Sequence, residues 1–119
     1  MNTVCHVLII EDEWLIAEHL SYLAEQAGAT SIATACTEDE AVQAALEHLP
    51  GIILSDVRLL AGTGPHAVQL IVAAMGDIPV IFITGTPEDC HPCGASSVIL
   101  HKPIDPAWVM ETFRRLAPV

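Results

Sequence analysis

Basic residues are scarce in this sequence. Four of its 119 residues are Lys or Arg against 15 Asp and Glu, which gives a net charge of −11. Such a charge repels phosphate backbones, which argues against nucleic acid as a direct partner. No apolar run approaches the roughly 20 residues that span a bilayer, and the first residues lack the basic segment of a secretory signal. We therefore expect a cytoplasmic protein that engages neither nucleic acid nor membrane.

Charged residues make up 16% of the chain and hydrophobic ones 52%, which indicates a compact globular fold rather than a disordered chain. The length suits one core, and no repeat or linker divides it, so residues 1–119 are expected to form a single domain without an attached output domain. Cysteines stand at positions 5, 36, 90 and 93. In the absence of an export signal they are expected to be reduced thiols.

Apolar, β-branched runs alternate along the chain with segments in which apolar residues recur at helical spacing. The runs predict strands at residues 4–10, 30–35, 52–56, 80–84 and 97–100, and the spaced segments predict helices at 14–27, 38–49, 65–75 and 106–116. This alternation predicts a parallel sheet with helices on both faces. Residues 85–96 contain two glycines and two prolines and are expected to form at most one or two helical turns. Trp14 and Trp108 are interpreted as packing residues.

Polar residues follow four of the predicted strands. Glu11 and Asp12 follow the first, Asp56 ends the third, Thr84 ends the fourth, and Lys102 follows the fifth. In a parallel sheet these ends share one edge, so side chains distant in sequence can meet there. Carboxylates gathered together repel one another, and a cation or a proton must relieve that repulsion. Mg²⁺ prefers such oxygen ligands, and a nearby ammonium and hydroxyl would suit a phosphoryl group.

With these residues in this order, the chain resembles the response-regulator receiver domain over nearly its whole length. The resemblance implies a flavodoxin-like, five-stranded sheet of order 2-1-3-4-5 whose fourth helix is here short or missing. It implies Mg²⁺ held by Glu11, Asp12, Asp56 and the backbone carbonyl of Arg58. It also implies that Asp56 is the phosphoacceptor, that Thr84 is the switch hydroxyl, and that Lys102 pairs with the phosphate.

A looser resemblance, in residues 52–64 and in Phe82-Ile83-Thr84-Gly85, is to receivers of the alphaproteobacterial general stress response, some of which stand alone. One departure concerns position 99, where receivers usually carry Tyr or Phe as part of the switch and this chain has Ile99. An aliphatic side chain cannot make the usual aromatic swing. We expect signalling to proceed by backbone movement near residues 85–96 and the last helix.

The resulting hypothesis is a signalling phosphoacceptor rather than an enzyme. It would take a phosphoryl group from a histidine kinase or histidine phosphotransferase and would switch a surface that binds a downstream protein, as a monomer or weak homodimer. One alternative is a receiver-like binding module that works without phosphorylation. Another is a Mg²⁺-dependent hydrolase, which would need an acid/base carboxylate where Arg58 stands.

Cys90 and Cys93 form a CxxC pair that we interpret as ordinary loop thiols, with a redox or zinc site as the alternative.

Overall fold

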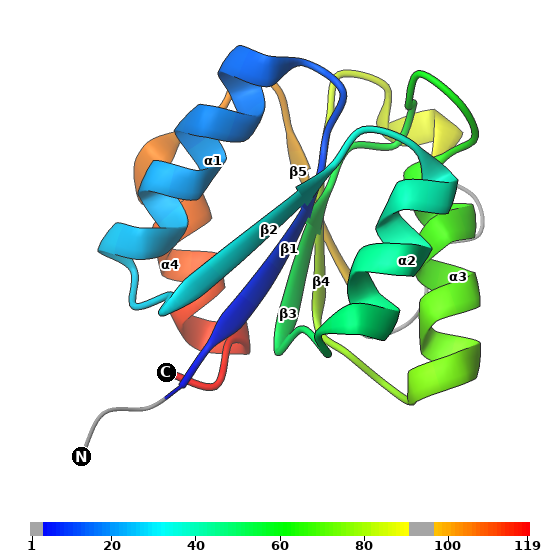
Figure 1. Cartoon of the computed structure of the whole chain (residues 1–119). Coiled ribbons are helices and arrows are strands. Elements are labelled where there is room, and N and C mark those ends of the chain that lie inside the picture. Colours follow the sequence, from blue (N-terminus) through cyan, green and yellow to red (C-terminus); the bar gives the residue numbers. More distant parts are fainter. Residues whose placement is uncertain (1–3, 91–96) are drawn as a thin grey trace.

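The computed structural model describes residues 4–90 and 97–119, and these form five strands, four α-helices and one short 3-10 helix. The strands are β1 (His6–Ile10), β2 (Ser31–Ala35), β3 (Ile52–Ser55), β4 (Val80–Thr84) and β5 (Ser97–His101). The helices are α1 (Trp14–Gln26), α2 (Glu38–Glu47), α3 (Gly64–Met75), the 3-10 helix η1 (Pro87–Asp89) and α4 (Pro106–Leu116). All strand pairs are parallel, and their order β2-β1-β3-β4-β5 confirms the predicted topology (Figure 1).

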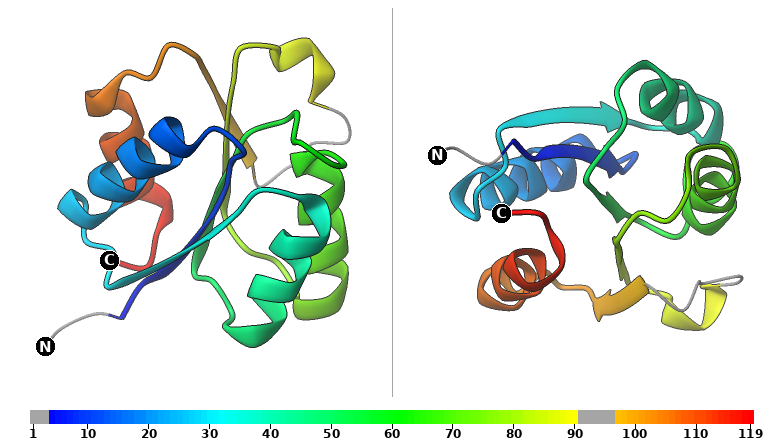
Figure 2. Two further views of the ribbon diagram at one scale, coloured as in Figure 1. Left: turned by 45° about the horizontal axis from the view of Figure 1, so that its top comes forward. Right: turned by 90° about the horizontal axis from the view of Figure 1, so that it is seen from below.

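Helices cover both faces of the sheet, with α1 and α4 on one side and α2 and α3 on the other (Figure 2). Successive strand residues point to opposite faces, so each central strand contributes to two cores. Val7 and Ile9 pack with buried residues of α1 and α4, whereas Leu8 and Ile10 pack with residues of α2 and α3. A strand that is buried on both faces is therefore apolar at every position, which explains the continuous hydrophobic runs in the sequence.

Three helices begin at residues whose side chains cap them. Thr37 accepts a hydrogen bond from the Glu40 amide, Thr63 from the His66 amide and Asp105 from the Trp108 amide. These bonds satisfy amides that have no partner within the helix. The caps at 37 and 105 confirm the predicted helix starts and hold the two helices next to the sheet edge where the polar strand ends lie.

The two tryptophans are not packing residues, contrary to the sequence interpretation. Trp14 is 70% exposed and Trp108 is 62% exposed. In α1 the residues that face the sheet are Ala17, Leu20, Leu23 and Ala24, and Trp14 precedes that face at the helix start. Helical position therefore decides which apolar side chains reach the core.

The described part of the segment after β4, residues 85–90, agrees with the prediction of at most one or two helical turns. Residues 87–89 form a single 3-10 turn, and residues 91–96, including Cys93, lie outside the described part of the chain. Cys90 is buried and disulfide-bonded, so the prediction of a reduced thiol at that position is wrong.

Among the described residues, the helices are too short or too polar to cross a bilayer.

Candidate functional site

The polar residues that follow the strands gather at the carboxyl edge of the sheet, where the loops meet at the top of Figure 1. Carboxylate oxygens of Glu11, Asp12 and Asp56 all lie within 4.8 Å of one another. Lys102 donates hydrogen bonds to two of these carboxylates. The structure therefore brings together three acidic residues and one basic residue that are scattered over 92 positions of the sequence.

Asp56 is fixed by the central strand that precedes it. Its amide donates to the carbonyl of Ile10 at 2.8 Å, which continues the ladder between β3 and β1. One carboxylate oxygen, Oδ1, accepts a hydrogen bond from the Val57 amide at 2.7 Å. The other oxygen, Oδ2, faces the Lys102 ammonium at 3.1 Å. The side chain is 12% exposed, so the hydrogen-bonded carboxylate keeps some access to solvent.

Lys102 follows the edge strand β5, which β4 separates from β3, and its side chain reaches the Asp56 carboxylate. Its amide donates to the carbonyl of Thr84, and its peptide bond to Pro103 is cis. The ammonium lies 3.2 Å from Glu11 Oε1 as well as 3.1 Å from Asp56 Oδ2. Burial opposes the charge on Lys102, but the hydrogen bond to Asp56 and the negative charges of Glu11 and Asp56 outweigh it. The pKa of Lys102 is therefore raised above its ordinary value.

Glu11 is the most deeply buried of the three acids, with 2% of its surface exposed. Its Oε2 accepts a hydrogen bond from the Glu13 amide. Burial, followed by the charge of Asp56, raises the pKa of Glu11 to about 7, although the Glu13 amide and the Lys102 ammonium oppose the shift. The cluster holds three carboxylates and one ammonium, so an added cation would relieve the remaining repulsion.

Thr84 lies at the end of β4 and is almost completely buried. Its hydroxyl oxygen accepts a hydrogen bond from the Thr86 amide at 2.9 Å and lies 3.3 Å from the Thr86 hydroxyl. Residues 84–86 therefore form a local turn in which the Thr84 hydroxyl already has partners. Because a hydroxyl can accept and donate at once, a new acceptor near Asp56 would compete only with the Thr86 hydroxyl for the Thr84 proton.

The side chain of Arg58 leads away from the acidic cluster. Its Nε donates to Asp89 Oδ2 at 2.9 Å, and its Nη2 contacts the same oxygen. The guanidinium is 72% exposed and links the loop after β3 to η1. The sequence singled out Arg58 for its backbone carbonyl and did not anticipate this ion pair.

Gly64, at the start of α3, is required by the backbone geometry next to Asp56. A Cβ at this position would overlap the carbonyl oxygen of Asp56 and the hydroxyl of Ser55. The Gly64 amide donates to the Val57 carbonyl at 2.8 Å, which closes the loop over residues 57–64. The role of this glycine depends on a close approach that only the folded chain creates.

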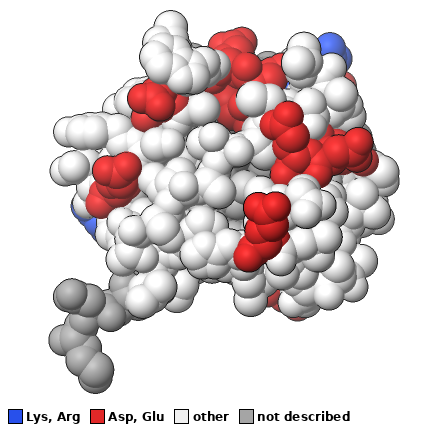
Figure 3. All heavy atoms as spheres, in the orientation of Figure 1, with Lys and Arg blue, Asp and Glu red and all other residues white. Residues whose placement is uncertain are grey.

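Acidic side chains spread from the site over the surrounding surface. In Figure 3 they gather toward the top and right of the molecule, over the strand ends and toward α2, where basic side chains are few. A field of one sign attracts cations and raises their local concentration. The surface therefore favours delivery of a divalent cation to the cluster.

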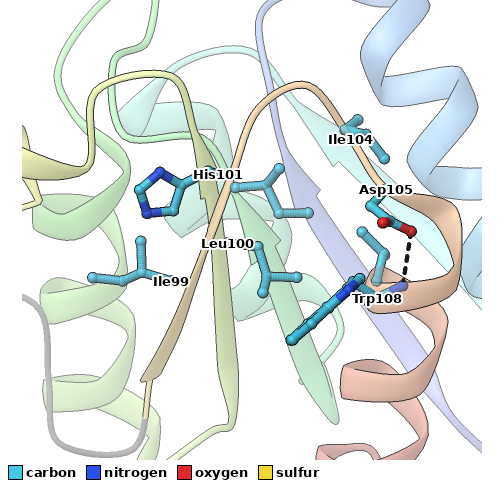
Figure 4. Close-up of a pocket in the computed structure, with 8 residues that line it drawn as sticks. Ile99, Leu100, His101, Ile104, Asp105 and Trp108 are labelled. Atoms are coloured by element: carbon cyan, nitrogen blue, oxygen red, sulfur yellow. Dashed lines mark hydrogen bonds between the residues drawn. The ribbon is translucent and has the colours of Figure 1, made fainter.

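A largely apolar groove of about 340 Å³ lies between β5 and α4. In Figure 4, Ile99 and His101 point to one side of β5, and Leu100 points to the other side, toward Trp108. Asp105 holds the first turn of α4 through its hydrogen bond to the Trp108 amide. Ile99 is 38% exposed and pairs with Phe82 of β4, so it occupies an edge position close to the turn that contains Thr84.

The family model described as "Response regulator receiver domain" matches residues 7–114. The chain belongs to this family. The receiver is 46% identical over 84 residues to the phyllosphere-induced regulator PhyR of Methylorubrum extorquens, a match that covers 69% of this chain and 31% of that protein. The chain therefore spans about a third of this curated relative.

Solved structures give the same assignment. The solution structure of the Erythrobacter litoralis PhyR receiver domain superposes with a TM-score of 0.86 at 35% identity, covering 95% of this chain and 89% of that one. A crystal structure of a mutant of PhyR from Bartonella quintana, described as an anti-anti-sigma factor, gives a TM-score of 0.75 at 31% identity. That match covers 96% of this receiver and 49% of the other chain. Both likenesses confirm the receiver fold.

Proposed function

We propose that this receiver accepts a phosphoryl group on Asp56 from a phosphohistidine of a histidine kinase or histidine phosphotransferase. An Asp56 carboxylate oxygen attacks the phosphorus, the phosphorus–nitrogen bond breaks, and the imidazole leaves with the electron pair of that bond. The observation that carries the proposal is the Lys102 ammonium, which contacts both Asp56 and Glu11 inside a cluster of three carboxylates. Such a constellation suits phosphoryl transfer, which depends on position and charge.

The acidic cluster fits Mg²⁺. Oxygens of Glu11, Asp12 and Asp56 lie close enough to share one ion, and these three carboxylates share the cluster with the single ammonium of Lys102. Hard oxygen ligands of this kind are those that Mg²⁺ prefers. These three side chains and the Arg58 carbonyl would hold the ion. When bound, it supplies positive charge that offsets the charge developing on the phosphoryl oxygens.

Lys102 and Thr84 would then act on the phosphoryl group. The Lys102 ammonium would pair with one of its oxygens in place of Glu11 Oε1, and a bound ion would compensate the charge of Glu11. The Thr84 side chain rotates so that its hydroxyl donates to another phosphoryl oxygen, and this rotation moves its oxygen away from the Thr86 amide. Because Thr84 and Thr86 share a turn, this exchange pulls on the segment that leads into η1. We assign the role of switch to this coupling.

The output surface that we propose comprises η1 and the groove between β5 and α4. It lies directly beyond Thr84, and its Ile99 and Trp108 side chains are exposed apolar groups available to a protein partner. The description of the Bartonella quintana protein as an anti-anti-sigma factor makes an anti-sigma factor a target class worth testing.

Incubation with acetyl phosphate and Mg²⁺, followed by intact-mass measurement, tests the proposal. We expect one phosphoryl group per chain, and none when Mg²⁺ is removed by a chelator. Asp56→Asn should abolish the modification, and Asp77→Asn, which changes an exposed acid between α3 and β4, should retain it. Failure of the parent protein to gain mass from either acetyl phosphate or a phosphorylated histidine phosphotransferase contradicts the proposal.

A second candidate is a binding module that works without phosphorylation. The observation that favours it is Ile99, which stands where receivers usually have an aromatic residue and which cannot exchange hydrogen bonds during a switch. Under this alternative, Asp56→Asn binds a target as tightly as the parent protein does, with or without phosphoryl donor. Under the phosphoacceptor proposal, the donor changes the affinity of the parent protein and leaves that of the variant unchanged.

A further inference from the structure

Glu38, the first residue of α2, contacts the loop that follows Asp56. Its Oε2 accepts a hydrogen bond from the Thr63 amide at 3.2 Å, and its Oε1 pairs with His66 Nδ1. Its own amide donates to the Ala61 carbonyl at 3.0 Å. The side chain is only 18% exposed. One residue of α2 therefore binds the loop and the first turn of α3 through three separate contacts.

The loop has a shape that admits this side chain. Gly62 has a φ of +81°, in the region that favours glycine, and lies directly against Glu38. A Cβ at Gly62 would overlap the carboxylate and the Cβ of Glu38. The contact therefore depends on both partners. The Glu38 side chain is long enough to reach the loop, and Gly62 leaves room for it.

Movement of this contact would be transmitted to Asp56, because the loop is short and internally bonded. Its two arms are joined by the bond from the Gly64 amide to the Val57 carbonyl and by a bridge between Arg58 and Thr63. The Val57 amide in turn donates to Asp56 Oδ1. A short series of hydrogen bonds therefore connects Glu38 with the phosphoacceptor carboxylate and with Arg58.

We propose that Glu38 is a positioning residue for the phosphorylation site. Its carboxylate holds residues 57–64 in one arrangement, so that the Asp56 side chain and the Arg58 carbonyl are placed for Mg²⁺ before the ion arrives. Groups that hydrogen-bond to metal ligands, or hold the segment that carries them, raise the affinity for the metal because they keep the ligands in the binding orientation. This inference rests on the phosphoacceptor function proposed above.

A positioning role differs measurably from a purely structural one. If Glu38 only stabilised the fold, its loss would lower the unfolding temperature and leave the Mg²⁺ response unchanged. If it positions the loop, its loss shifts the Mg²⁺ concentration for half-saturation, and saturating Mg²⁺ restores most of the phosphorylation rate. The exposed Trp14, close to Asp12 in the chain, offers a fluorescence signal for the titration, in a Trp108→Phe background that removes the other tryptophan.

The test compares Glu38→Ala and Glu38→Gln with Glu47→Gln, which removes the same charge from an exposed position at the other end of α2. For Glu38→Ala we expect half-saturation at about tenfold higher Mg²⁺, the lower end of the cost of losing a group that supports a ligand. Amide hydrogen exchange in residues 57–64 should accelerate. Glu38→Gln keeps an oxygen for the Thr63 amide and should show a smaller shift, and Glu47→Gln should match the parent.

Unchanged Mg²⁺ half-saturation and unchanged loop exchange in Glu38→Ala would overturn the inference, while phosphorylation of the parent at Asp56 would still stand. If Glu38→Ala does not fold, Glu38→Gln and His66→Gln decide the question. A parental Mg²⁺ response in both would overturn the inference, and a shift in either would support it. A parent protein that neither binds Mg²⁺ nor accepts phosphate would instead contradict the proposed function.

Discussion

Lys102 and Asp56 lie 46 positions apart in the sequence and meet through a hydrogen bond of 3.1 Å between Nζ and Oδ2. The same ammonium lies 3.2 Å from Glu11 Oε1, so one cation holds two carboxylates together. The charge of this cluster is unbalanced. Its consequences for stability, for pH dependence and for switching can be measured separately.

Lys102→Met should destabilise the Mg²⁺-free protein, because it leaves two partly buried carboxylates without their cation. We expect a loss of roughly 2–3 kcal/mol in the free energy of unfolding at pH 8, somewhat below the usual cost of breaking a fully buried pair. The loss should shrink at pH 5, where Glu11 takes up a proton. Urea unfolding at both pH values provides the measurement, with Arg115→Gln at an exposed position of α4 as the control. Equal losses at both pH values would contradict this account of the cluster.

Glu11 should make the Mg²⁺-free protein less stable as the pH rises. The pKa of Glu11 is raised from 4.5 to about 7, so between these values the folded state holds a proton that the unfolded state releases. Stability is therefore greatest below pH 4.5 as far as this group is concerned, and it falls as the pH passes through 7. The full difference amounts to as much as about 3 kcal/mol.

Glu11→Gln removes the titrating carboxyl group and should flatten the pH dependence of the free energy of unfolding between pH 5 and 8. His6 acts in the opposite sense, since burial and the neighbouring His48 lower its pKa, but parent and variant share it and its effect cancels. Addition of Mg²⁺ at pH 8 should stabilise the parent more than the variant. Parallel pH profiles for the two proteins would show that Glu11 is not the group responsible.

Beryllofluoride, a phosphoryl mimic, should change hydrogen exchange beyond Thr84. With Mg²⁺ present, we expect altered protection in residues 85–90 and 105–112, because the Thr84 hydroxyl leaves the Thr86 amide and the neighbouring Arg58–Asp89 pair must adjust. Even a shift of ~1–2 kcal/mol would change populations by roughly five- to thirtyfold. Thr84→Ala should suppress the change, and Thr34→Ala on β2 should not. A response confined to residues 37–49 would place the switch on another face.

The sequence predicted the fold and the members of the acidic cluster well, because both follow from local patterns. A strand buried on both faces is apolar throughout, as at residues 52–54, and the charged residue that ends it marks the sheet edge. Asp56 and Lys102 could be expected to meet there once the topology was known. The family resemblance supplied the strand order, which periodicity alone does not determine.

The features that could not be predicted from the sequence depend on contacts between distant residues. Glu38 looks like one more acid in the first turn of a helix, and only the fold places it against Thr63 and Gly62. His6 and His48 gave no sign of interacting, yet their rings stack 3.5 Å apart, and His6 is buried with a hydrogen bond to Ser31. The direction of the Arg58 side chain likewise depends on Asp89, 31 positions away.

Chemical mapping of the phosphorylated residue tests the central claim most directly. Protein treated with acetyl phosphate and Mg²⁺ is reduced with borohydride, which converts an aspartyl phosphate to homoserine, and the digested peptides are sequenced by fragmentation mass spectrometry. We predict homoserine at position 56, dependent on Mg²⁺ and sharply reduced in Lys102→Met. Homoserine at another aspartate, or an unmodified Asp56 under conditions in which Mg²⁺ is bound, would contradict the account.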